Sequence, residues 1–150
     1  MIPAEALKNR LITLLVSRKG EFAPANPELD KFDHSLQCAT RAWKAGEPPD
    51  YVVMALFHDV FGGFHSHRHG EMVETVLWRW LSQRAREAVR DHEESTSEVR
   101  IIGVGGINLR PGAPESLVFA AAYDYPSFDP NYESYVLARF YPLIDEVIHD

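Results

Sequence analysis

An unbroken apolar segment, Tyr51 to Phe57, lies in the middle of the chain and ends in the polar pair His58-Asp59. Pro48-Pro49-Asp50 precedes this segment and the helix-breaking pair Gly62-Gly63 follows it, so the pattern predicts a short buried helix. The pair at its end places a neutral nitrogen donor beside a carboxylate. Because an unpaired carboxylate is costly to bury, the pair favours a metal ion as its partner.

Other segments of the chain also have the apolar spacing of helices. Ser82 is a suitable N-cap for one of them, and Gly20 and Gly46 are suitable stops. Between Ser95 and Pro114 the helical pattern is lost, and the stretch near residues 99–113 predicts a Gly-rich loop or a short hairpin. The expected helices cover residues 3–20, 27–45, 48–59, 68–81, 82–92, 115–123 and 133–148.

Length and composition limit the class of protein. The 150 residues, 45% of them hydrophobic, fit a single all-α domain spanning residues 1–150, with a bundle of about six or seven helices. A net charge of −7 argues against a nucleic-acid surface, which needs clustered lysine and arginine. Cys38 is the only cysteine and no segment has the character of a signal peptide or membrane span, so a cytoplasmic protein without disulfides is expected.

Four further residues are candidates to complete a metal site with the His-Asp pair. Each lies at an expected helix end or on an inward helix face, where several helices can converge on one buried point. Six ligands are too many for one ion that also binds substrate, but they suit two ions that share a carboxylate. The full candidate set is His34, His58, Asp59, His69, His92 and Asp124.

The candidate ligands are four imidazoles and two carboxylates, which favour iron, manganese or zinc over calcium or magnesium. A lone histidine is more often a surface or core residue than a ligand, whereas the ordered set of six favours a metal site. His65 and His67 lie in the loop beside the expected ligands. They are candidates to contact the substrate, and a solvated loop is the alternative interpretation.

The order of these residues, H…HD…H…H…D over residues 34 to 124, resembles the HD-domain superfamily, which is named for its adjacent His-Asp ligands. Two local segments are similar to mixed-valent di-iron oxygenases within that superfamily. Asp33-His-Ser-Leu-Gln-Cys-Ala39 resembles the segment around the first ligand of the organophosphonate-cleaving oxygenase. Asp124-Tyr-Pro-Ser-Phe-Asp-Pro-Asn-Tyr132 resembles the segment around the last ligand of myo-inositol oxygenase.

The resemblance implies an HD-domain helical bundle and a role for each ligand. His34, His58, Asp59 and Asp124 would bind one iron, and His69 and His92 would hold a second iron that Asp59 bridges to the first. Asp59 would thereby be the central catalytic residue. The implied cofactor is a mixed-valent Fe(II)/Fe(III) pair, with manganese, nickel or zinc as alternatives. The implied reaction uses dioxygen to cleave a C–C or C–P bond.

Three functions remain open at this point. The first is an oxygenase acting on a small hydroxylated, anionic metabolite. Its anionic group would bind Arg41, Arg100 or Arg110, because the lysines that hold substrate in the two known oxygenases have no counterpart here. The second is a dinuclear phosphohydrolase, as in many HD-domain proteins. The third is a module of the same fold without enzymatic activity, which the complete ligand set disfavours.

Overall fold

The computed structural model describes residues 2–23, 26–62, 68–102 and 111–150. Within these residues the predicted all-α class is confirmed, with eight α-helices and one small antiparallel hairpin. None of the described helices is long and apolar enough to cross a membrane. The helices are α1 (Ala4–Val16), α2 (Lys31–Lys44), α3 (Pro49–Phe57), α4 (His69–Leu77), α5 (Gln83–Arg90), α6 (His92–Ile102), α7 (Glu115–Phe119) and α8 (Tyr141–Val147).

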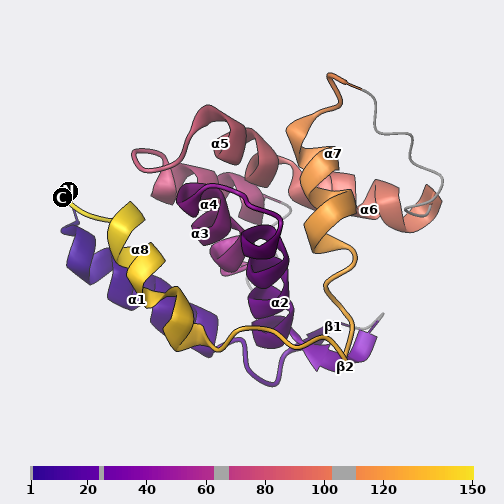
Figure 1. Ribbon diagram of the computed structural model, residues 1–150, viewed down its shortest axis with the longest axis horizontal. Helices are drawn as coiled ribbons and strands as arrows, with labels where there is room; N and C mark the ends of the chain where they lie inside the picture. The colour runs from indigo at the N-terminus through magenta and orange to yellow at the C-terminus, as the bar shows by residue number, and fades with distance from the viewer. Residues whose placement is uncertain (1, 24–25, 63–67, 103–110) are drawn as a thin grey trace.

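Helix α3 forms the centre of the bundle, as its apolar sequence predicts. Every residue from Tyr51 to Phe57 is at most 1% exposed. The helix packs against α2, α4, α5 and α8, so all of its faces meet other helices (Figure 1). A helix that is apolar all round is stable only in such a position. The residues that directly follow α3 therefore lie in the interior of the molecule.

The two ends of the chain meet beside α1 and α8, which lie next to each other in Figure 1. The backbone N–H of Ala4 donates to Asp150 Oδ1 at 3.1 Å, and Lys8 Nζ donates to Asp145 Oδ1 at 2.9 Å. These contacts are on the opposite side of α3 from α6 and α7 (Figure 1). The terminal helices thus complete the core without covering the region where the candidate ligands gather.

The second predicted helix begins later than its sequence pattern suggested. Strand β1 (Phe22–Ala23) pairs with β2 (Asn26–Asp30), and α2 starts only at Lys31. Asp30 sets this boundary, because its Oδ1 accepts the N–H of Asp33 and its Oδ2 accepts the N–H of Gly20. Such an N-cap fixes the first turn of a helix. The prediction of helix from residue 27 was wrong for this reason.

A larger correction concerns the stretch after His92. Residues 92–102 form α6, so the expected loop from Ser95 and the expected hairpin from residue 99 were wrong for that part. His92 opens α6 and does not close α5, which ends at Arg90. The β-branched residues Val99 and Ile101 suggested an extended strand, but tertiary packing overrides such propensities: Val99 is fully buried beside Ala120 and Ala121. Residues 103–110 lie outside the described part of the chain.

The last predicted helix is shorter than expected. Residues 133–136 are not helical; the segment η3 (Leu137–Phe140) is a 3-10 helix, and α8 follows from Tyr141. Pro142 explains the break, because proline has no N–H to donate and is tolerated only in the first turn of an α-helix. The expected N-cap at Ser82 is confirmed, since its Oγ accepts the N–H of Ala85 at 3.2 Å.

Candidate metal centre

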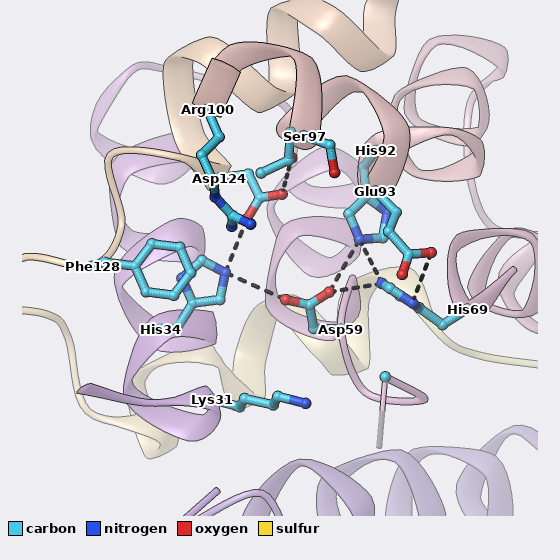
Figure 2. Close-up of a pocket in the computed structure, with 12 residues that line it drawn as sticks. Lys31, His34, Asp59, His69, His92, Glu93, Ser97, Arg100, Asp124 and Phe128 are labelled. Carbon is cyan, nitrogen blue, oxygen red and sulfur yellow. Dashed lines mark hydrogen bonds and ion pairs between the residues drawn. The ribbon is translucent and has the colours of Figure 1, made fainter. Parts of the chain in front are cut away.

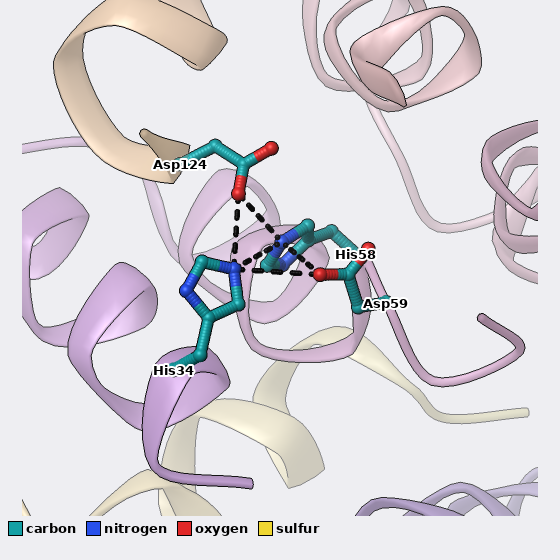
Figure 3. A group of neighbouring side chains, drawn as sticks. All are labelled: His34, His58, Asp59 and Asp124. Carbon is teal, nitrogen blue, oxygen red and sulfur yellow. Dashed lines mark hydrogen bonds and ion pairs between the residues drawn. The ribbon is translucent and has the colours of Figure 1, made fainter. Parts of the chain in front are cut away.

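The structure brings the six candidate side chains into two adjacent clusters that could hold metal ions. The first donor group is His34, His58, Asp59 and Asp124, and the second donor group is Asp59, His69 and His92. Asp59 belongs to both groups, with Oδ2 directed at the first and Oδ1 directed at the second. Figure 3 shows the first group, in which all four side chains point toward one another.

Three parts of the fold deliver the first donor group. His34 lies one turn into α2, and its ring stacks on Phe128 with the ring centroids 4.0 Å apart. His58 and Asp59 occupy the turn that ends α3, where Val60 N–H bonds back to the Phe57 carbonyl. The carboxyl end of a helix carries partial negative charge, so this position favours a cation.

Asp124 reaches the first group through an irregular helical turn. Helix α7 continues into the π-helical segment η2 (Ala120–Asp124), closed by the bond from Tyr125 N–H to the Ala120 carbonyl. A π-turn widens the helix by one residue, and such turns are frequent at functional sites. Thr96 on α6 then donates to Asp124 Oδ2 at 2.5 Å, which leaves Oδ1 facing His34 at 2.9 Å.

The second donor group depends on a close approach of α4 to the junction of α5 and α6. His69 opens α4 and His92 opens α6. Gly70 permits this contact, because a Cβ atom there would lie 2.2 Å from the Val89 carbonyl oxygen and 2.6 Å from that of Arg90. Arg90 also binds the Glu74 carboxylate of α4 through two nitrogens, which joins α4 to α5.

The separations between donor atoms fit metal coordination in both groups. A metal bound at about 2.1 Å to each ligand places neighbouring ligand atoms about 3.0 to 3.4 Å apart. In the first group the Nε2 atom of His34 lies 3.2 Å from His58 Nε2 and 3.4 Å from Asp59 Oδ2. In the second group Asp59 Oδ1 and the Nε2 atoms of His69 and His92 are all 3.0 Å from one another.

Each of the four histidines holds its other ring nitrogen against an acceptor. The Nδ1 atoms of His34, His58 and His92 lie 2.8, 2.6 and 2.7 Å from the carbonyl oxygens of Ser127, Ala55 and Val89. His69 Nδ1 lies 3.2 Å from Glu93 Oε2. A neutral imidazole that donates from Nδ1 presents an unshared electron pair at Nε2. Two such pairs facing each other repel, and a proton or a metal ion between the two nitrogens would relieve the repulsion.

The charges of the site also favour a cation. Burial alone would lower the pKa of His34, but hydrogen bonds to Asp124 and Asp59 raise this pKa to about 9. Burial works against the charge of Asp59 as well, yet the neighbouring His58 and the hydrogen bond with His34 hold its pKa well below the usual range. The pKa of Asp124 is lowered in the same way. Both carboxylates therefore stay charged and attract either protons or metal ions.

A cavity of about 290 Å³ opens over the two groups. Figure 2 shows Asp59 at its centre, with His34 and Asp124 toward one end and His69 and His92 toward the other. Asp59 is the most exposed of the donors, with 22% of its side chain accessible, while His34 and His92 are 1% and 2% accessible. A small molecule in this cavity would meet the shared carboxylate and the two donor groups together.

The substrate-contact candidates differ in their positions. Arg100 lines the cavity, and its head group points into it in Figure 2. Arg41 does not line the cavity; it donates to Gln37 Oε1 at 3.1 Å and stacks over the Tyr132 ring. Its side chain is therefore used in packing. His65, His67 and Arg110 lie outside the described residues.

Sequence reasoning missed other residues of the cavity wall. Lys31, Ser97 and Phe128 line it, and Thr96 both lines it and holds Asp124. Glu93, Thr96, Ser97 and Arg100 have the i, i+3, i+4, i+7 spacing of one helix face. That spacing was hidden because the stretch was interpreted as a loop. Lys31 lies three residues before His34, so a helix starting at Lys31 would have placed both on one face.

A comparison of the chain with protein families finds no matching family, and a comparison with curated proteins finds no matching relative.

Proposed function

We propose that the two donor groups hold two metal ions bridged by the Asp59 carboxylate, and that the chain is a dinuclear enzyme of the HD-domain type. The observation that carries this proposal is the position of Asp59, which directs one oxygen at each group. The remaining donors are four imidazole Nε2 atoms and one oxygen of Asp124. Since Nδ1 of each imidazole faces an acceptor, all four Nε2 atoms are prepared as ligands.

Iron is the metal that we propose. Nitrogen and carboxylate donors without sulfur suit iron, manganese and zinc, and they disfavour calcium and magnesium. The preference for iron rests on the resemblance of two segments, Asp33–Ala39 and Asp124–Tyr132, to di-iron oxygenases. These segments carry His34 and Asp124, whose donor atoms lie 2.9 Å apart.

The proposed activity is that of an oxygenase, which cleaves a C–C or C–P bond in a small hydroxylated, anionic metabolite. An iron pair in this site would supply the activation of dioxygen. The chain contributes by fixing the ligands, because His34, His58 and His92 are almost fully buried and each Nδ1 is anchored. Among the described residues the second donor group offers three protein ligands beside the cavity, which would leave positions for substrate oxygens.

A dinuclear phosphohydrolase is the second candidate. Two metal ions joined by a carboxylate are a common arrangement for hydrolysis of phosphate esters, in which they stabilise the attacking and leaving oxygens. The specific observation in its favour is the pair of cationic side chains, Lys31 and Arg100, that line the cavity. Both can make charge-assisted hydrogen bonds to the oxygens of a phosphate group.

Metal analysis combined with electron paramagnetic resonance separates these functions. The protein is loaded anaerobically with Fe(II), partly oxidised, and offered hydroxylated phosphonates and polyols while oxygen uptake is recorded. We expect about two irons per chain, a spectrum of a coupled Fe(II)/Fe(III) pair, and substrate-dependent oxygen uptake. Release of phosphate from phosphate esters by a zinc or manganese form, without oxygen uptake by the iron form, would favour the hydrolase. Failure to bind any metal would overturn both.

A further inference from the structure

We propose that Lys31 and Arg100 form an oxyanion-binding subsite above the metal centre. This inference deepens the proposed function and rests on it, because it assigns the anionic group of the substrate to two particular side chains. The substrate class is a small molecule with a phosphate, phosphonate or carboxylate group. Lys31 comes from the start of α2 and Arg100 from the last turns of α6, so two separate elements contribute to the subsite.

The first observation is that these two cations lack partners within the chain. Neither side chain has an ion pair, hydrogen bond or ring contact among the described residues. Among the described lysines and arginines, Arg10 on α1 is the one other whose side chain has no such contact, and it does not line the cavity. Elsewhere cations are paired, as Arg84 is with Glu47 and Arg90 with Glu74. Two unpaired cations at one cavity therefore suggest a ligand.

The second observation is their placement. Both residues line the cavity that contains the donor groups, and in the view of Figure 2 they lie on either side of His34 and Asp59. Arg100 follows Thr96 by one helical turn, and Lys31 precedes His34 by one turn. Lys31 therefore shares α2 with the donor His34, and Arg100 shares α6 with Thr96, which hydrogen-bonds the donor Asp124. A molecule bound between the two would contact the metal centre at the same time.

The charge of the site is the third observation. Two metal ions would bring more positive charge than the carboxylates of Asp59, Asp124 and Glu93 can balance. Lys31 and Arg100 add to this excess, and like charges so close together are unfavourable unless an anion lies among them. The chain as a whole carries a net charge of −7, so this local excess of positive charge is not a general property of its surface.

The two ends of the cavity differ in charge, and this difference would determine at which end the anionic group of the substrate binds. In Figure 2 Arg100 lies beside Asp124 and Lys31 lies below His34 and Asp59, whereas Glu93 lies beside His69 at the other end. Glu93 would repel an oxyanion there. The anionic group is thus placed over the first donor group, and the remainder of the molecule extends across Asp59 toward the second. Arginine and lysine both make charge-assisted hydrogen bonds to such oxyanions.

Titration calorimetry with simple anions tests the subsite. The probes are inorganic phosphate, methylphosphonate and acetate, with glycerol as a neutral control, and each is titrated into the metal-free and the metal-loaded protein. Lys31→Gln and Arg100→Gln should each weaken binding of at least one anion by about ten-fold or more, because each removes a charge-assisted hydrogen bond. Arg10→Gln is the matched control, and it should leave the affinity unchanged.

The outcomes separate the subsite from the metal proposal. Unchanged affinity for every anion in both variants would overturn the subsite, including the case in which anions bind only to the metal ions of the loaded protein. Metal content is measured for each variant in parallel, and it should equal that of the unsubstituted chain. If no metal binds but the two variants still weaken anion binding, the subsite stands and the proposed function fails.

Discussion

The two donor groups share Asp59 but are built differently. In the first donor group, four protein donors meet in the interior, and the side chains of His34, His58 and Asp124 are at most 5% exposed. In the second, three donors meet at the cavity and His69 is 9% exposed. The histidines of the first group are anchored to backbone carbonyls, whereas His69 depends on the side chain of Glu93.

From this difference we infer which donor group would bind its ion tightly and which would exchange its ion. Buried ligands anchored to the backbone lose little entropy on binding, and they exclude the water that would compete for the ion. In the part of the chain that the structure describes, the second group has fewer ligands, and its His69 is oriented by the partly exposed Glu93 carboxylate. We therefore expect the first group to bind its ion more tightly, and the second group to offer positions for substrate.

Removal of the shared carboxylate should have the largest effect. Asp59→Ala takes one ligand from each group and leaves two facing pairs of imidazole nitrogens without a negative charge between them. We expect both metal ions to be lost, as measured by elemental analysis of the purified protein. Asp33→Ala is the matched control, because Asp33 is an exposed acid one residue before His34. Full metal content in Asp59→Ala would contradict the bridging role.

Single histidine substitutions should separate the two groups. His92→Ala removes a ligand from the second group alone, so the protein should retain about one ion, held by the first group. His58→Ala should remove the ion of the first group. The second group should also bind its ion more weakly, because the Asp59 carboxylate then loses its contact with the His58 ring. His149→Ala, at an exposed histidine near the end of the chain, is the control. Equal metal loss in His92→Ala and His58→Ala would show that the groups do not differ as described.

Most of the fold could be predicted from the sequence because the central helix has such a clear apolar pattern. The apolar segment from Tyr51 to Phe57 defines a buried helix, and the helices around it have ordinary spacing or caps such as Ser82. Prediction from the local sequence pattern was wrong where a long-range contact contributes to the structure. Residues 92–102 form a helix in which Val99 packs beside Ala120 and Ala121, and nothing local to Val99 signals that contact.

The candidate ligands could be chosen from the sequence because the His58-Asp59 pair ends an apolar segment, where an unpaired carboxylate is costly to bury. Their division into two groups that share Asp59 is visible in the structure. The residues that orient them could not be found, because backbone carbonyls of Ala55, Val89 and Ser127 carry no side-chain signal. Arg41 was chosen for its charge alone, and its contacts with Gln37 and Tyr132 show why charge is insufficient.

Gly70→Ala should damage the second group and spare the first. The added Cβ would overlap the Val89 and Arg90 carbonyl oxygens, so α4 must move away from the start of α6 and carry His69 from His92. We expect a loss of about 1 to 3 kcal/mol in the free energy of unfolding, with the second ion bound more weakly. Denaturant unfolding and metal titration measure the two effects.

Gly46→Ala is the control for this substitution. Gly46 has φ +85°, and nothing lies within 4 Å of a Cβ added there. The variant should therefore lose stability through backbone strain, by about 1 kcal/mol, while it keeps both ions. A similar loss of the second ion in Gly46→Ala would show that general destabilisation, and not the contact of α4 with α6, controls that group.

The smallest effect should come from Thr96→Val, which tests whether the first group depends on its support. Valine has nearly the shape of threonine but cannot donate to Asp124 Oδ2, so the carboxylate is free to rotate away from His34. Loss of such a supporting hydrogen bond weakens metal binding by about ten-fold or more. Competition with a chelator, followed for each ion, should show this weakening in the first group. Ser97→Ala changes the neighbouring hydroxyl, which has no bond to a donor, and should leave both affinities unchanged. An unchanged affinity of the first ion in Thr96→Val would show that the hydrogen bond from Thr96 to Asp124 has no part in holding that ion.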